Sequence, residues 1–466
     1  PASIIKLNIN LLKNPLLHII NNSLLQGIFP DCFKKGKVVP IYKGGEKNKC
    51  ENYRPINLNC VIGKLIEKCV KIQVTKYVTD HDILFKNQFG FRKDKNLNDN
   101  LYTLTTSIHQ SIVSNKKTLL IFIDLAKAFD VIDRDLLIKM LDCAGFDNTS
   151  LNWFRSYLSN RSQVVSIFDE HSEEKYNDFG VIQGSTLGPL LFLIYVNNPG
   201  KVELNQGKMF LYADDTALLF EGASWEEVFG VAERGLCAVR RWFDQNRLTV
   251  NVKKTKYMAI SLRADCDPVN LSLRLHNCGN RNGCFSCECV ERVSEYKYLG
   301  VMVDCRLKWS SHVTYINNKL RKCIFIFNNL SDVLPFNLLR TVYYAYVQSI
   351  LQYGIIAWGR TYKKNMMPLE ITQKAIMKAA IQKPRLYSTE ALFDEFKVFN
   401  INQLYARVIV MYIFKNKSKM FQNVTHTYLT RTASNIGIST PRVSKTINYT
   451  NPFFVSTVIL KRLPSD

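Results

Sequence analysis

The sequence predicts an α+β fold in which helices pack around a small antiparallel sheet. Two apolar runs, Met209–Leu211 and Ala217–Phe220, flank a short polar segment and predict a β-hairpin. A third run, Leu119–Ile123, places five consecutive apolar residues before Asp124, which is typical of a strand buried on both faces. Segments with helical spacing separate these strands, so helices and strands mix along the chain.

Most of the remaining chain has apolar side chains at the spacing of amphipathic helices. Helices are predicted over residues 1–28, 63–80, 99–113, 131–141, 150–158, 187–196, 225–246, 310–330 and 337–353. A short strand is predicted at 38–41 and a second hairpin at 162–182. A chain of 466 residues is long enough to form two to four domains.

The charge of the chain predicts a polyanionic partner. Sixty-two Lys and Arg residues against 39 Asp and Glu give a net charge of +23, a surplus that suits nucleic acid. No apolar run reaches the roughly 18 residues that span a bilayer, and no signal peptide is evident, so we expect no membrane partner. Thirteen cysteines in a chain of this length indicate reduced thiols, and hence a nuclear or cytoplasmic protein.

Two adjacent acids, Asp214 and Asp215, occupy the tip of the predicted hairpin. Neighbouring carboxylates repel each other, and a hard divalent cation such as Mg²⁺ removes the conflict. A solvated turn is the alternative. Asp124 follows a buried strand, and an acid at the end of such a strand could point into a cleft. Its alternative role is to cap the next helix, but that role suits Asp130 or Asp133 better. Three carboxylates from two strands would suit a pair of metals roughly 4 Å apart.

Around these acids the chain resembles the reverse transcriptases of non-LTR retrotransposons, most of all the jockey group of insect elements. The resemblance runs in order from about Phe29 to Asp304. Its motifs are Ile41–Gly45 and Tyr53–Ile56 (fingers), Gln88–Arg92, Ile123–Asp130 (motif A), Gln183–Ser185 with Gly188–Pro189 (motif B), Tyr212–Asp215 (motif C), Asn251–Lys256 (motif D) and Tyr298–Gly300 (motif E).

The resemblance implies a right-hand polymerase architecture, with an antiparallel-sheet palm, fingers and a helical thumb. The expected divisions are a helical lead-in at 1–23, fingers and palm at 24–304, the thumb at 305–360 and a basic C-terminal extension at 361–466. That extension could continue the nucleic-acid track or be a solvated helical face. Because the chain begins at Pro1 and the match starts soon after, we expect a fragment of a longer reading frame.

The implied metal ligands are Asp124, Asp214 and Asp215, with the backbone carbonyl of Leu125. They would hold two Mg²⁺ ions, with Mn²⁺ as the substitute, for in-line nucleotidyl transfer. Lys254 in motif D would protonate the leaving pyrophosphate, although its neighbours Lys253 and Lys256 are alternatives.

The remaining implied roles concern the nucleotide and the primer. Lys43 and Arg54 would bind the triphosphate, rather than being plain surface charge. Phe129, which could also be a core residue, would exclude a ribose 2′-hydroxyl. The other members of the predicted set are the backbone N–H groups of Lys127 and Ala128, then Gln183 and Gly184 beside the template base, and Leu299 with Gly300 as the primer grip.

Four cysteines, Cys278, Cys284, Cys287 and Cys289, form a cluster whose spacing is irregular for a zinc knuckle. We therefore favour a loop of reduced thiols over a zinc site.

Taken together, the resemblance predicts an RNA-directed DNA polymerase that uses an RNA template, a DNA primer or target, and dNTPs. A catalytically inactive or domesticated remnant that only binds nucleic acid is the alternative. An intron-encoded maturase is a third interpretation, but the residues of motifs A and C resemble the jockey group instead and argue against it. Oligomeric state is left open.

Overall fold

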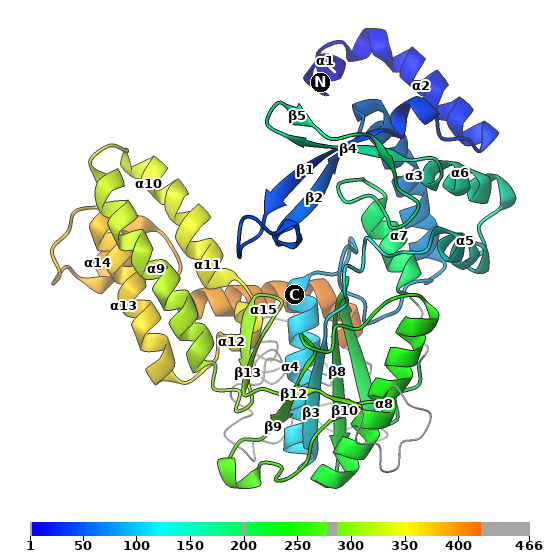
Figure 1. Ribbon diagram of the computed structural model, residues 1–466. Coiled ribbons are helices and arrows are strands. Elements are labelled where there is room, and N and C mark those ends of the chain that lie inside the picture. The colour runs from blue at the N-terminus through cyan, green and yellow to red at the C-terminus, as the bar shows by residue number, and fades with distance from the viewer. Residues whose placement is uncertain (1, 198–201, 277–286, 421–466) are drawn as a thin grey trace, which may run out of the picture.

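The computed structural model describes residues 2–197, 202–276 and 287–420. Its helices and strands form an open hand, in which two groups of elements face each other across a central sheet (Figure 1). The predicted α+β class is confirmed. We use the names palm, fingers and thumb for these three parts.

The palm sheet has five strands in the order β12-β9-β3-β8-β7, and all its neighbours are antiparallel except β12 and β9. Its strands are β3 (Lys117–Ile123), β7 (Gly207–Tyr212), β8 (Asp215–Gly222), β9 (Lys256–Ile260) and β12 (Glu291–Arg292). Helices α4 (Leu97–Val113) and α8 (Trp225–Gln245) pack against it. Two small hairpins complete this part: β10 (Arg274–Leu275) with β11 (Glu288–Cys289), and β13 (Glu295–Tyr298) with β14 (Val301–Asp304).

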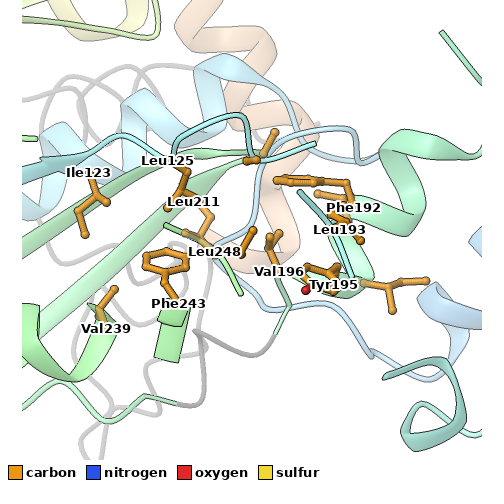
Figure 2. Packing of buried hydrophobic residues seen from close by; sticks show 14 of the residues in the cluster. Ile123, Leu125, Phe192, Leu193, Tyr195, Val196, Leu211, Val239, Phe243 and Leu248 are labelled. Atoms are coloured by element: carbon orange, nitrogen blue, oxygen red, sulfur yellow. The ribbon is translucent and has the colours of Figure 1, made fainter. Parts of the chain in front are cut away.

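Strand β3 is buried on both faces, as its unbroken apolar run predicts, because alternate side chains enter two different cores. Leu119, Ile121 and Ile123 belong to the core shared with α8 and the fingers. Leu120 and Phe122 belong to the core shared with α4 and the thumb. Figure 2 shows part of the first core, where Leu125 and Leu211 lie above Phe243 of α8. The residues that flank Asp124 are therefore anchored in packed interior.

The fingers contain a second sheet in the order β2-β1-β4-β5, with β6 also paired to β4. Their elements are α1 (Ala2–Leu7), α2 (Ile9–Gln26), β1 (Gly36–Tyr42), β2 (Tyr53–Leu58), α3 (Val61–Asp80), α5 (Arg134–Cys143), α6 (Asn148–Leu158), β4 (Ser162–Ile167), β5 (Glu170–His171), β6 (Lys175–Tyr176) and α7 (Gly188–Tyr195). Asp133 caps α5, since its carboxylate accepts a hydrogen bond from the Leu136 N–H at 2.8 Å.

The predicted hairpin at 162–182 is shorter in the structure and ends as a strand at Tyr176. The ladder ends there because Tyr176 is opposite Ser162, the first residue of β4, so no strand residue is left to pair beyond it. Arg134, whose side chain is half-buried, holds the segment that follows. It donates hydrogen bonds to the carbonyl oxygens of Asn177, Phe179 and Gly180. This charged fork holds residues 177–180 as a loop that leads into motif B.

The thumb is helical and runs through α9 (Ser310–Ser331), α10 (Phe336–Tyr343), a π-helical turn (Tyr344–Gln348), α11 (Ser349–Gln352), α12 (Ile355–Trp358), α13 (Lys363–Ala380), α14 (Thr389–Phe396) and α15 (Ile401–Met420). Helix α13 packs along α9. Helix α15 returns to the palm, where Tyr412 packs on Tyr102 with ring centroids 4.2 Å apart and Lys415 pairs with Asp99 at 3.2 Å. Residues 361–420 thus share the thumb and palm core. The predicted division at 360 and the role of the extension, whose residues 421–466 lie outside the described part, stay predictions.

Candidate active site

The two acids of motif C lie at the tip of a tight hairpin. Strands β7 and β8 pair in register up to Tyr212 and Asp215, so Ala213 and Asp214 form a two-residue loop. Ala213 has a left-handed backbone with φ of 57°, which a two-residue hairpin loop commonly requires. The predicted hairpin with acids at its tip is thus present in the structure.

The third acid lies beside this tip because of strand register. Strand β3 pairs with β8 so that Ile123 is opposite Thr216. Asp124 directly follows Ile123 and Asp215 directly precedes Thr216, so the register brings the two acids to the same end of the sheet. Neighbouring strands lie about 5 Å apart. Acids separated by ninety residues in the sequence therefore converge at one end of the palm sheet.

The acids act on one another electrostatically. Loss of solvent around its carboxyl raises the pKa of Asp215 to about 6, and the negative charges of Asp214 and Asp124 contribute less. Burial also raises the pKa of Asp214, the charge of Asp124 adds to the rise, and the guanidinium of Arg54 opposes it. The cluster thus carries net negative charge when all three acids are ionised, and the nearby cations of Arg54 and Lys254 offset it only in part.

This donor set fits a hard divalent cation, because three carboxylates supply oxygen ligands and a cation would relieve their repulsion. Within the described residues, no three His, Cys, Asp or Glu side chains already stand in a metal-ligating cluster. The carboxylate of Asp124 instead lies 3.6 Å from the Lys254 ammonium. Metal binding would therefore require the three carboxylates to move from the positions that they have in this structure.

Motif D is tied to the same acid through the backbone. The N–H of Asn251 donates to the carbonyl of Asp124 at 2.8 Å, and the turn that follows holds Lys254 beside the acid cluster. Lys256, one of the alternative lysines, pairs with Glu291 at 2.5 Å. Lys254 is therefore the motif D lysine for which the structure shows an ion pair with the acid cluster.

The predicted triphosphate residues lie on the fingers hairpin β1–β2. Lys43 directly follows β1, and Arg54 pairs across the hairpin with Ile41. Both side chains are exposed. Arg54 lies close enough to Asp214 to lower the pKa of that carboxyl, which places its positive charge on the palm side of the fingers.

Motif B forms a loop that packs on the fingers. Gly184 has φ of 104°, and a side chain there would meet the Asn57 carbonyl oxygen, which lies 2.4 Å from an ideal Cβ. The glycine thus allows close approach to fingers backbone, in addition to the role predicted beside the nucleotide. The amide of Gln183 donates to the Asp130 carboxylate at 2.6 Å, which links motif B to motif A.

One buried carboxylate, which was not predicted from the sequence, is hydrogen-bonded to the motif B loop. Glu67 on α3 is 1% exposed. It accepts hydrogen bonds from the Thr186 N–H at 2.5 Å and from the Tyr157 hydroxyl at 3.1 Å. Burial raises the pKa of Glu67, while these bonds and the charge of Arg161 oppose the rise. The sequence did contain one signal for this residue, because Glu67 is an acid on the apolar face of the predicted helix 63–80.

The predicted sugar gate, Phe129, lies in a stack of aromatic rings. It packs face to face on Phe192 of α7, with centroids 4.0 Å apart and planes at 14°. The exposed Phe91 meets its other side edge-on at 6.3 Å. Lys127, with φ of 48°, and buried Ala128 form the turn that carries Phe129 from β3 to this stack.

Motif E is the β13–β14 hairpin, whose loop is Leu299 and Gly300. Both loop residues have left-handed φ values, 47° and 80°, as a tight two-residue turn requires. Stacking of Tyr296 on Phe122 of β3, with centroids 4.1 Å apart, fixes this hairpin against the palm sheet. The predicted primer grip is thus held on the same sheet as the acids.

The zinc prediction rests partly on Cys278 and Cys284, which lie outside the described residues. Of the other two, Cys287 is half-buried and Cys289 is exposed on β11. The preference for a loop of reduced thiols over a zinc site therefore stays a prediction. Every helix in the described ranges is too short or too polar to cross a lipid bilayer.

Comparison with known proteins agrees with this geometry. The family described as reverse transcriptase (RNA-dependent DNA polymerase) matches residues 41–303. The chain is 26% identical over 403 residues to the probable RNA-directed DNA polymerase from transposon BS of Drosophila melanogaster, covering 84% of this chain and 43% of that protein. It is 26% identical over 400 residues to the RNA-directed DNA polymerase from mobile element jockey of the same fly, covering 82% and 41%.

The chain therefore spans less than half the length of these curated relatives. Among solved structures, apo telomerase from Candida tropicalis aligns at 10% identity with a TM-score of 0.42, covering 84% of this chain and 68% of that one. That likeness is too distant to carry an argument about function. Proteins of the matched family act on nucleic-acid templates and use divalent metal ions such as Mg²⁺. The family match covers more than half of the sequence and includes all three acids, so the chain belongs to the reverse transcriptase (RNA-dependent DNA polymerase) family.

Proposed function

We propose that this chain catalyses RNA-directed DNA synthesis for a non-LTR retrotransposon, adding dNTPs to a primer 3′-hydroxyl. The observation that carries the proposal is the register of β3 against β8, which sets Asp124 beside the hairpin acids. The raised pKa values of Asp214 and Asp215 support it, since an acid cluster of this kind is suited to cation binding.

In the proposed reaction, the primer 3′-oxygen attacks the α-phosphorus of the dNTP, and pyrophosphate leaves on the opposite side. Asp124, Asp214 and Asp215, with the Leu125 carbonyl, would hold two Mg²⁺ ions. When bound, such ions stabilise the attacking and leaving oxygens and lower the pKa of the hydroxyl.

Cationic and aromatic side chains of the protein would bind the triphosphate, protonate the leaving group and select the sugar. Arg54 and Lys43 would neutralise the triphosphate, as their exposed positions beside the palm allow. The Lys254 ammonium, 3.6 Å from Asp124, would give a proton to the pyrophosphate as the P–O bond breaks. The stack of Phe129 on Phe192 would hold a rigid ring beneath the sugar and exclude a 2′-hydroxyl.

Primer extension on an RNA template with Mg²⁺ tests the proposal, with the Asp214→Asn variant alongside. We expect wild-type protein to extend the primer and the variant to lose nearly all extension while retaining primer–template binding. Equal product from the two proteins would reject the catalytic assignment. Binding without any wild-type extension would favour the inactive or domesticated remnant instead.

A further inference from the structure

The thumb tyrosine Tyr353 covers the loop of motif E. Its hydroxyl donates a hydrogen bond to the carbonyl oxygen of Leu299 at 3.0 Å. Its ring lies against Gly300, where an ideal Cβ would be 3.0 Å from the ring Cε1 atom and 3.1 Å from the hydroxyl oxygen. Tyr353 and Gly300 are therefore in close contact, and a side chain at Gly300 would require the ring to shift by a few tenths of an ångström.

The backbone of Tyr353 is anchored in the thumb core although its side chain is not. Its carbonyl accepts a hydrogen bond from the indole N–H of fully buried Trp358 at 3.0 Å. The next residue, Gly354, has φ of 61°, and its Cα packs so tightly on Val301 of β14 that a Cβ would lie 2.6 Å from a Val301 methyl. Tyr353 as a whole residue remains 48% exposed. A rigidly anchored but exposed aromatic side chain suits a binding surface.

The Tyr353 phenol is close enough to the motif C hairpin to be affected by it electrostatically. Burial raises the pKa of the Tyr353 phenol, and Tyr212, the first residue of motif C, adds to the rise. Tyr353 is thus within electrostatic range of the residue two positions before Asp214. The thumb and the motif E loop thus meet at this ring.

We infer that Tyr353 is a primer-binding residue, whose ring packs against the sugar and base of the primer's 3′-terminal nucleotide while its hydroxyl holds the motif E loop. This inference rests on the proposed function and extends the predicted primer grip from motif E to the thumb. Because the hydroxyl already has an acceptor on Leu299, the ring would make a sequence-independent apolar contact. Stacking of a base on an aromatic ring tolerates any base sequence, because every base has a π-face.

The alternative role for Tyr353 is a structural latch between thumb and palm, with no contact to nucleic acid. The two roles differ in where along the primer a substitution is felt. A latch affects the whole bound duplex and the stability of the protein, whereas a contact residue affects the terminal nucleotide alone.

The test uses a primer–template carrying 2-aminopurine either at the primer 3′ end or ten nucleotides upstream. Fluorescence is read on binding, without dNTPs, for wild type, Tyr353→Phe and Tyr353→Ala. Tyr346→Ala is the matched control, because Tyr346 is also an exposed thumb tyrosine (61%) and lies on the π-helical turn away from motif E.

We expect Tyr353→Ala to remove most of the fluorescence change at the terminal probe and to leave the upstream probe unchanged. Tyr353→Phe should keep most of the terminal signal, since it retains the ring. In extension assays, Tyr353→Ala should raise the KM for primer–template several-fold with an unchanged KM for dNTP. Tyr346→Ala should match wild type in every assay.

The inference is overturned if Tyr353→Ala gives a wild-type terminal signal, or if both probes lose signal equally with a lowered melting temperature. A wild-type protein that shows no terminal signal also overturns it. Because the probe assay needs no synthesis, failure of wild-type extension would reject the polymerase proposal separately and leave the Tyr353 result to be judged by fluorescence.

Discussion

The side-chain carbonyl of Gln88 accepts a hydrogen bond from the backbone N–H of Ala213 at 3.0 Å, although 125 positions separate the two residues. The same oxygen accepts a second bond, from the Gly90 N–H, at 2.9 Å. Backbone bonds run alongside it, from the Phe89 N–H to the Leu211 carbonyl and from the Leu211 N–H to the Asn87 carbonyl. One buried amide thus supports the left-handed residue that precedes Asp214.

Replacement of Gln88 by methionine should destabilise the protein by about 1–3 kcal/mol, because two buried N–H groups would lose their acceptor. Urea denaturation measures this, and we also expect lower kcat in primer extension. Gln73→Met is the matched control at an exposed glutamine and should stay within about 0.5 kcal/mol of wild type. Equal stabilities for the two variants would show that Gln88 does not support the hairpin.

Phe129→Val should relax discrimination against ribonucleotides. A smaller side chain in the stack on Phe192 leaves room for a 2′-hydroxyl. The ratio of kcat/KM for dNTP over rNTP measures the effect, and we expect it to fall at least tenfold. Phe168→Val, at a phenylalanine that is 96% exposed, serves as the control. Unchanged selectivity in Phe129→Val would remove the gate assignment.

Affinity for Mg²⁺ should fall as pH drops through about 6. The pKa of Asp215 is raised to about 6, so below that value the carboxyl is protonated and cannot bind a cation. Without metal, the same group favours the folded state more as pH falls from about 6 toward its ordinary value, because the folded protein then binds the extra proton. Titration calorimetry from pH 5 to 8 checks the affinity, and Asp215→Asn should flatten the dependence. A flat wild-type profile would contradict the assignment.

Glu67→Gln should destabilise the fingers and weaken dNTP binding together. The substituted amide has only one oxygen, whereas the carboxylate accepts from both Thr186 and Tyr157. We expect a loss of about 1–3 kcal/mol in chemical denaturation and a raised KM for dNTP. Glu51→Gln, at an exposed acid, should change neither quantity. A Glu67→Gln variant with wild-type stability would show that this buried carboxylate does not hold motif B.

Binding to an RNA–DNA duplex should depend steeply on salt. A net charge of +23 favours many phosphate contacts, each of which releases condensed counterions. Between 50 and 200 mM salt we expect affinity to drop by about 10³-fold if six or more phosphates are contacted. Fluorescence anisotropy measures it. A nearly constant Kd across this range would mean that the excess charge is ordinary solvated lysine.

Reading along the chain was sufficient to predict the strand before Asp124 and the hairpin that carries Asp214 and Asp215. The unbroken apolar run before Asp124 is long enough to be buried on both faces of a sheet, and the paired acids between two apolar runs indicate a hairpin tip. These are local properties of spacing and side-chain type.

How these elements meet could be learned only from the folded chain. Strand register places Asp124 beside Asp215, and the side chains of Gln88 and Glu67 hold motifs C and B across 125 and 119 positions. The loop after Tyr176 is held by a guanidinium from another helix, and the tyrosine that covers motif E comes from the thumb. Such contacts depend on how distant segments pack against each other. The periodicity of apolar residues along the chain does not reveal which backbone group a buried polar side chain will bond to.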